Sequence, residues 1–206
     1  MSNTIGLVPG SISGAIGYRD ELGGQRDRIV RLGSASLLGG ITGAILLLTL
    51  PSSAFEAIVP VLIVIALLLV VFQPRLSRVL AERRTQTKPH GGPALWTGIY
   101  GTGVYGGYFG AAQGIILLAL MGIAMPDEDL QRLNALKNVL AAIVNGVAAV
   151  LFIAVADVAW APALILAVGA AAGGQIGAKV GRRLSPALLR GVIVVVGVAA
   201  IVQIVL

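Results

Sequence analysis

Long apolar runs separated by short polar segments dominate the chain, and their lengths predict membrane-spanning helices. A bilayer core requires about 20 consecutive apolar residues for each spanning α-helix. Six runs approach or reach this length, at residues 3–18, 32–50, 55–72, 130–155, 161–180 and 187–206. A polar loop at 75–93 follows the third run and divides the chain into a first transmembrane repeat, 1–74, and a second, 94–206. The predicted fold class is therefore an all-α integral membrane protein.

A further apolar stretch, 94–125, is too long for one spanning helix and has glycines through its centre, in the run GTGVYGGYFGAAQG. The positions of the basic residues bear on how this stretch meets the membrane. Thirteen of the 15 lysines and arginines lie in three segments, 19–31, 75–88 and 179–190. The positive-inside rule places these three segments in the cytoplasm.

Segments on the same side of a membrane are separated by an even number of crossings. The helices at 130–155 and 161–180 supply two crossings between the second and third basic segments, so the stretch 94–125 is predicted not to cross. A re-entrant pair of half-helices, which enters, turns at the glycines and leaves on the same side, satisfies this condition. Broken backbone at such a depth is tolerated where protein buries it. The alternative is one long, kinked spanning helix.

Two parts of the chain resemble each other at a nearly constant offset. Residues 38–44 are LGGITGA and residues 172–178, 134 positions later, are AGGQIGA; the first apolar run aligns with the fourth at an offset of 135, which pairs Asn3 with Asn138. Matching elements fall on opposite sides, which predicts two inverted repeats with a substrate site near the midplane. On this offset the partner of the glycine-broken stretch would lie about 40 residues before Met1, so the first repeat is expected to be incomplete at its N-terminus.

Composition excludes several classes of function. Hydrophobic residues make up 57% of the chain and charged residues 12%, whereas a soluble domain has about 25% charged residues, so most of the surface faces lipid. The net charge of +6 arises in the short segments between apolar runs, which indicates a topology signal rather than a nucleic acid partner. There is no cysteine, His90 lies in the polar loop, and no carboxylate falls in a predicted helix core. We therefore expect no enzyme and no metal or cofactor site.

The helix at 130–155 contains the most informative polar residues. Lys137 and Asn138 follow Asn134 by three and four positions, and Asn145 follows Asn138 by seven. These spacings predict that the four side chains share one face of the helix. Lys137 is expected about 10–15 Å beyond the start of the helix, and an ionisable group at such depth indicates a functional site. The alternative is that Lys137 extends to the interface while the asparagines join helices. Before this helix, the acidic residues 127–129 are predicted to cap its N-terminus.

The glycine break offers complementary chemistry. A half-helix that begins within 110–114 would point free N–H groups and a positive dipole end toward the site. Tyr105, Tyr108 and Gln113 could donate further hydrogen bonds. An ammonium group and a helix N-terminus both favour negative charge, so the predicted substrate is an anion; the alternative is that the glycines and tyrosines serve packing. Repeat-related candidates in the first helix are Asn3, Thr4, Ser11 and Ser13.

The chain resembles the TauE/SafE sulfite exporter family of membrane permeases in several runs. In the second half these are GIYGTGVYGGYFGAAQGIILLALMGI, NALKNVLAAIVN and AGGQIGAKVGRRLSPALLR, and in the first half NTIGLVPGSISGAIGYRDEL, LLGGITGAILLLTLP and FEAIVPVLIVIALLLVVFQPRL. The resemblance covers essentially the whole chain. It implies substrate-binding roles for Gly106, Gly107, Gly110, Gln113, Asn134, Lys137 and Asn138.

The resemblance also implies a function. The expected activity is movement of a small sulfur-containing anion, such as sulfite, sulfoacetate or a related organosulfonate, across the cytoplasmic membrane by alternating access and without a cofactor. The alternative is a truncated, non-transporting membrane subunit or scaffold that needs a partner, because family members have a further glycine-rich segment before the asparagine that matches Asn3. Expected partners are the small anion and the lipid bilayer, and the glycine-lined helix faces permit a homodimer.

Overall fold

The computed structural model describes residues 1–51, 92–110, 113–125 and 127–181, with a few isolated positions elsewhere. Within these ranges the regular elements are all helical, which confirms the predicted all-α class. Their order is α1 (Ser2–Gly17), the 3₁₀ turn η1 (Arg19–Leu22), α2 (Arg26–Thr49), α4 (Gly92–Tyr108), α5 (Gln113–Ala124), α6 (Leu130–Val155) and α7 (Trp160–Gly181). The helices predicted at 55–72 and 187–206 lie outside the described residues.

Among the described residues, three helices are long and apolar enough to cross a membrane. They are Arg26–Thr49, Gln131–Val155 and Trp160–Gly177. The remaining helices are shorter, with 16 residues in α1, 17 in α4 and 12 in α5. Several candidate spans in one chain identify a multi-pass membrane protein, as the apolar runs predicted.

The start of α2 differs from the sequence-based prediction. The helix was predicted from residue 32 but begins at Arg26, so that Arg28 and Arg31 belong to its first two turns rather than to a loop. No proline or glycine interrupts this stretch, arginine is a good helix former, and Asp27 in the first turn favours the positive end of the helix. The basic segment is therefore a helical extension of the apolar run.

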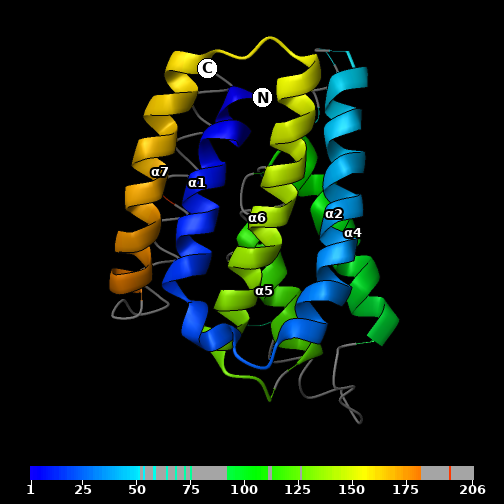
Figure 1. Cartoon of the computed structure of the whole chain (residues 1–206). Coiled ribbons are helices and arrows are strands. Elements are labelled where there is room, and N and C mark those ends of the chain that lie inside the picture. The colour runs from blue at the N-terminus through cyan, green and yellow to red at the C-terminus, as the bar shows by residue number, and fades with distance from the viewer. Residues whose placement is uncertain are drawn as a thin grey trace.

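Helix α6 is the central element of the described bundle (Figure 1). It contacts α1 and α2, while α7 packs on the far side of α1 and α4 packs on α2. The start of α1 and the α6–α7 connection lie at one end of the bundle, where the backbone N–H of Ala159 donates to Ser2 Oγ at 3.0 Å. The turn η1 and the α5–α6 connection lie at the opposite end (Figure 1).

Helices α2 and α4 run parallel with their backbones in contact. Gly39 lies against Tyr100 and Gly43 lies against Val104, so residue numbers increase in the same direction along both helices. A Cβ at Gly39 or Gly43 would collide with the carbonyl oxygen of Tyr100 or Val104. In lipid the hydrophobic effect does not drive helices together. Small residues let the two backbones approach closely, and the resulting van der Waals contacts stabilise the helix pair.

Helices α1 and α7 pack in the same parallel manner. Gly6 lies against Leu166, Gly10 against Ala170, and Gly174 against Gly10, where a Cβ at Gly174 would lie 2.7 Å from the Gly10 carbonyl oxygen. The Ser13 hydroxyl, one turn further along α1, donates to the carbonyl of Ala171 at 2.8 Å. The bundle therefore has two glycine-packed parallel pairs, and α6 contacts both.

The chain reverses between α4 and α5. The amides of Phe109 and Gly110 both donate to the carbonyl of Tyr105, at 2.8 and 3.2 Å, and Gly110 has φ +81°, the left-handed conformation that commonly ends helices at glycine. The chain then runs back along α4, since a Cβ at Gly98 would lie 3.2 Å from Leu120 of α5. The two helices form an antiparallel hairpin whose tip is at the glycine run.

An apolar cluster packs the hairpin against α2 and α6. The buried side chains that α5 and α6 contribute to this cluster pack together along most of α5. The first residues of α5 lie outside the cluster. The buried side chains are Leu32, Ala35, Leu95, Ile99, Leu117, Met121, Ala124, Met125, Leu133, Leu136 and Leu140.

Candidate functional site: a donor cluster between α5 and α6

Lys137 lies on α6 beside the first residues of α5. Its Nζ donates to Oδ1 of Asn134, one turn earlier, at 3.1 Å. The aliphatic part of its side chain passes over Gly114, where a Cβ would lie 3.3 Å from Lys137 Cδ. The absence of a side chain at Gly114 thus creates the space in which the lysine lies.

Helix α5 begins at Gln113, within the range predicted for a half-helix start. The first four N–H groups of an α-helix have no acceptor within the helix, and they form its positive end. Gln113 itself is only 4% exposed, and its Nε2 has no hydrogen-bond partner among the described residues. A Cβ at Gly106 would lie 2.5 Å from Gln113 Oε1, so the glycine on α4 provides the room for this amide.

These groups form a cluster that is rich in hydrogen-bond donors. The Lys137 ammonium offers three donors and uses one described acceptor, Asn134. The Gln113 amide and the first turn of α5 add donors to the same neighbourhood. Buried donors are usually satisfied, and a positive charge beside a helix N-terminus favours an anionic acceptor. The described residues hold no group of three or more metal-ligating side chains.

Asn138 and Asn145 do not join this cluster. Asn145 Nδ2 donates to Ser11 Oγ on α1 at 3.0 Å, and a Cβ at Gly14 would lie 3.4 Å from Asn138 Nδ2. The single polar face predicted for α6 is therefore divided between two neighbours. The physical reason is that consecutive residues such as 137 and 138 are about 100° apart around a helix, an arc wide enough to contact both α5 and α1.

The glycines assigned by resemblance have different positions. Gly106 accommodates Gln113 and Gly110 ends α4, so both shape the hairpin tip near the cluster. Gly107 faces the other way, and a Cβ there would lie 2.5 Å from the carbonyl oxygen of Gly40 on α2. Gly107 is therefore a helix-packing residue in this structure, and a contact between it and a bound anion is not supported by the geometry.

Two of the four candidates in α1, Asn3 and Thr4, line a separate cavity at the hairpin tip. The other two, Ser11 and Ser13, bond to Asn145 and Ala171. The volume of the cavity is about 530 Å³, and it opens between the first residues of α1, the last turn of α2 and the end of α4. Its lining residues are Met1, Asn3, Thr4, Leu47, Leu48, Leu50, Tyr108 and Phe109. Asn3, Thr4 and Tyr108 are thus brought together, although not with Lys137.

The family of the chain follows from comparison with known proteins. The model of the sulfite exporter TauE/SafE family matches residues 1–204. The chain belongs to this family. No curated protein and no solved structure matches it. TauE/SafE proteins are integral membrane transporters of anions such as sulfite and are not enzymes, so the predicted family, membrane location and non-enzymatic class are confirmed.

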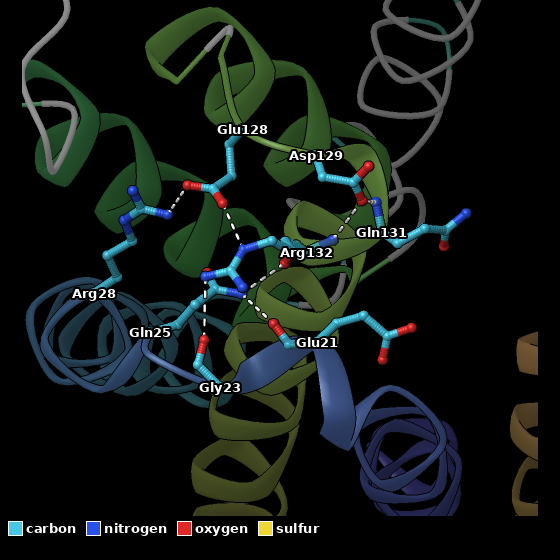
Figure 2. A network of polar contacts seen from close by, with 8 residues as sticks. All are labelled: Glu21, Gly23, Gln25, Arg28, Glu128, Asp129, Gln131 and Arg132. Atoms are coloured by element: carbon cyan, nitrogen blue, oxygen red, sulfur yellow. Dashed lines mark hydrogen bonds and ion pairs between the residues drawn. The ribbon is translucent and has the colours of Figure 1, made fainter.

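The TauE/SafE chain also contains an ion-pair network that the sequence did not predict, at the end of the bundle formed by η1 and the α5–α6 connection (Figure 2). Glu128 pairs with Arg28 of α2 and with Arg132 of α6, the latter at 2.5 Å. Gln25 Nε2 donates to the carbonyl oxygens of Glu21 and Arg132 at 2.8 and 3.2 Å. The network joins α2, η1 and the start of α6.

The acidic residues before α6 in this TauE/SafE chain therefore have different roles. Asp129 caps the helix, as predicted, and accepts from the amides of Gln131 and Arg132 at 2.7 and 3.4 Å. Glu128 was also predicted as a cap but is an ion-pair partner. Burial raises the pKa of its carboxyl, but the hydrogen bonds and charges of Arg28 and Arg132 outweigh burial, and the pKa lies below its ordinary value. The i,i+4 spacing of Glu128 and Arg132 is visible in the sequence, whereas the contact with Arg28 is not.

Proposed function

We propose that this chain moves a small sulfur oxyanion or organosulfonate, such as sulfite or sulfoacetate, across the cytoplasmic membrane, and that the anion binds between Lys137 and the start of α5. The observation that supports this site most directly is the excess of donors over acceptors around Lys137 and Gln113. Oxyanions present several acceptor oxygens and a negative charge, which match an ammonium, an amide and a helix N-terminus. Asn134 orients the ammonium through its hydrogen bond.

The hairpin is proposed to enter the membrane from one side and return to it. Helices of 17 and 12 residues rise about 25 and 18 Å, less than the roughly 30 Å of a bilayer core. Because α4 runs parallel to α2, it begins at the end of the bundle where Arg28 and Arg132 lie. This geometry favours the re-entrant arrangement over a single kinked span.

The helix pairs α1–α2 and α6–α7 are proposed to be inverted repeats. Gly40 of α2 lies against Val147 of α6, and Gly174 of α7 lies against Ser13 of α1. On the offset of 134 for α2 and α7, Gly40 corresponds to Gly174, and on the offset of 135 for α1 and α6, Val147 corresponds to Ile12, the neighbour of Ser13. Two contacts that the repeat relates to within one residue support it, and inverted repeats are the usual basis of alternating access.

The alternating-access step follows from the placement of the cluster. The donor groups lie beside the hairpin tip, and the cavity lined by Asn3, Thr4 and Tyr108 opens from the tip toward the end of the bundle opposite the ion-pair network. We propose that an anion released from Lys137 leaves through this cavity in one conformation. In the other conformation it exchanges with the side where the basic residues lie.

The test is reconstitution of the purified chain in liposomes with a sulfite-flux assay. The wild-type chain is expected to give flux, and Lys137→Ala is expected to lose it while inserting normally. Lys179→Ala is the matched control, because Lys179 is an exposed lysine in the last turn of α7 and should leave flux unchanged. Normal flux through Lys137→Ala would exclude Lys137 from the site. Absence of flux through the wild-type chain alone would favour a subunit that needs a partner.

A further inference from the structure

An open groove of about 400 Å³ runs between α1 and α6 and reaches the end of the bundle where η1 lies (Figure 1). Each helix contributes an alanine between two larger branched side chains, namely Ile12, Ala15 and Ile16 on α1 and Val139, Ala142 and Ile143 on α6. Spacings of three and four residues place each set of three on one face of its helix. Ile12 is 47% and Ile16 55% exposed, so the groove is open toward the outside of the bundle.

The groove lies at membrane depth. Its three α6 residues fall inside the candidate span Gln131–Val155. The side chains that α1 and α6 contribute are all aliphatic and contain no hydrogen-bonding group. An open apolar groove at this depth is surrounded by lipid chains rather than by water, so hydrocarbon is the chemistry that fits it.

A positive charge lies where the groove reaches η1. Arg19 is the first residue of η1 and lines the groove together with Leu22. Its described ion pair is with the neighbouring Asp20, through Nε at 3.6 Å, and the two side chains are 77% and 91% exposed. An exposed pair of this kind contributes little, and a planar guanidinium can hold a phosphate through two parallel N–H bonds. Arginine also extends its stem along apolar surface while its charge stays at the membrane boundary.

We propose that one acyl chain of a membrane phospholipid lies in this groove and that the phosphate of the same lipid binds the Arg19 guanidinium. The groups along the groove, first apolar and then cationic, match the order of acyl chain and phosphate in the lipid. An apolar helix of another protein would match the groove but would leave Arg19 without an anion. The inference goes beyond the proposed transport function, since it depends on neither Lys137 nor the identity of the transported anion.

The first experiment tests the phosphate contact. The full-length chain, purified in detergent, is titrated with dioleoyl phosphatidylglycerol or with dioleoylglycerol, which has the same acyl chains and no phosphate, and bound lipid is counted by native mass spectrometry. The wild-type chain is expected to bind phosphatidylglycerol about fivefold more tightly, and Arg19→Gln should remove this preference. Arg26→Gln is the matched control, because Arg26 is an exposed arginine at the start of α2 that does not line the groove. No preference in the wild-type chain, or an equal loss in the two variants, would overturn the proposal.

The second experiment tests the acyl chain. Ala142→Leu places a branched side chain inside the groove, so the affinity for phosphatidylglycerol is expected to fall about tenfold. Ala154→Leu makes the same change at an exposed position of the same helix outside the groove and should leave the affinity unchanged. If Ala142→Leu lowers the melting temperature in detergent, Ala15→Leu fills the groove from α1 instead.

Two outcomes of the second experiment would overturn the proposal. One is unchanged lipid binding by a folded variant with a filled groove. The other is a wild-type chain that binds no lipid but forms a dimer that Ala142→Leu abolishes, because a second copy would then occupy the groove. Neither experiment uses sulfite, so failure of the lipid site and failure of the proposed transport function are distinguishable.

Discussion

The two sides of α6 look alike in the sequence but make different contacts in the structure. On the side of α1, Asn145 donates to a hydroxyl on another helix, so this amide has a protein partner. On the side of α5, the Lys137 side chain lies against Gly114 in the first turn of the helix. The glycine provides space, and the free N–H groups of this turn are hydrogen-bond donors, as the Lys137 ammonium is. Among the described residues, the Asn145 amide therefore donates to an acceptor on another helix, whereas the Lys137 ammonium donates to Asn134 of its own helix and Gln113 Nε2 has no acceptor. The anion site proposed above lies on this second side of α6.

The comparison is tested most severely by removing the polar group on each side. Lys137→Met keeps the apolar stem but removes the charge, and sulfite flux is expected to fall at least about 100-fold because the anion loses its counter-charge. Asn145→Leu removes an amide on the α1 side and should keep flux near wild type while lowering thermal stability in detergent. Flux in liposomes and thermal unfolding of both variants provide the measurement. Equal flux losses would show that the two sides do not differ.

A second test fills the space beside Lys137. Gly114→Leu places a branched side chain where the stem of Lys137 lies, and flux is expected to fall about tenfold because the ammonium moves away from the start of α5. Gly122→Leu makes the same change on the same helix at a position where a Cβ meets no described atom within 4 Å. A similar loss in the two variants would point to a general effect on α5 rather than to the site.

A smaller effect is expected at the position that holds Gln113. Gly106→Ala brings a methyl group into contact with the Gln113 amide, which must shift, and we expect the apparent KM for sulfite to rise a few-fold, by about 1 kcal/mol or less in binding free energy. Gly101→Ala is the control on the same helix, since a Cβ there meets no described atom within 4 Å. If KM is unchanged in both variants, the Gln113 amide does not contact the anion.

The smallest effect concerns stability at the start of α6. The pKa of the Glu128 carboxyl is lowered in the folded chain from an ordinary value of 4.5. The ion pairs therefore stabilise the fold above about pH 4.5, and this contribution is lost as the pH falls through the folded pKa. Glu128→Gln should lower the melting temperature by roughly 3–8 °C at pH 7 and have less effect at pH 3.

Asp20→Asn is the matched control for this pH series. Asp20 pairs with Arg19 but is 91% exposed, so the substitution should change the melting temperature little at any pH. Flux should be retained in both variants at neutral pH, since the described contacts of Lys137 are with Asn134 and Gly114. A pH-independent destabilisation by Glu128→Gln would mean that the carboxyl acts through packing rather than through its charge.

Local pattern predicted much of this fold. The bounds of α1, α6 and α7 fall within two residues of the predicted apolar runs, because length and hydropathy are local properties. The start of α5 within the glycine run was also predicted, because glycine is a strong helix terminator. The start of α2 was not predicted correctly. The prediction began the helix at the first residue of the apolar run and did not consider that arginine is a good helix former.

The contacts of the site were less predictable. Lys137 and Gln113 were both recognised as candidates, but their proximity depends on the antiparallel hairpin, which brings α5 back onto α6. The division of the asparagines between two helices depends on which neighbours surround α6, and no spacing encodes that. The contact of Arg28 with Glu128 joins residues 100 positions apart and has no local signal.

The backbone contacts between α2 and α4 determine which parts of the molecule are free to move. At Gly39 and Gly43 there is no room for even a methyl group, so α4 cannot slide along α2 without a carbonyl striking the neighbouring helix. The hairpin and α2 are therefore expected to travel as one rigid body. On the alternating access proposed above, we expect the surface between α5 and α6, where the Lys137 side chain lies against Gly114, to open, with the contact of Gly40 with α6 as the hinge. A rocking motion about this fulcrum would widen and close the gap in which Lys137 lies.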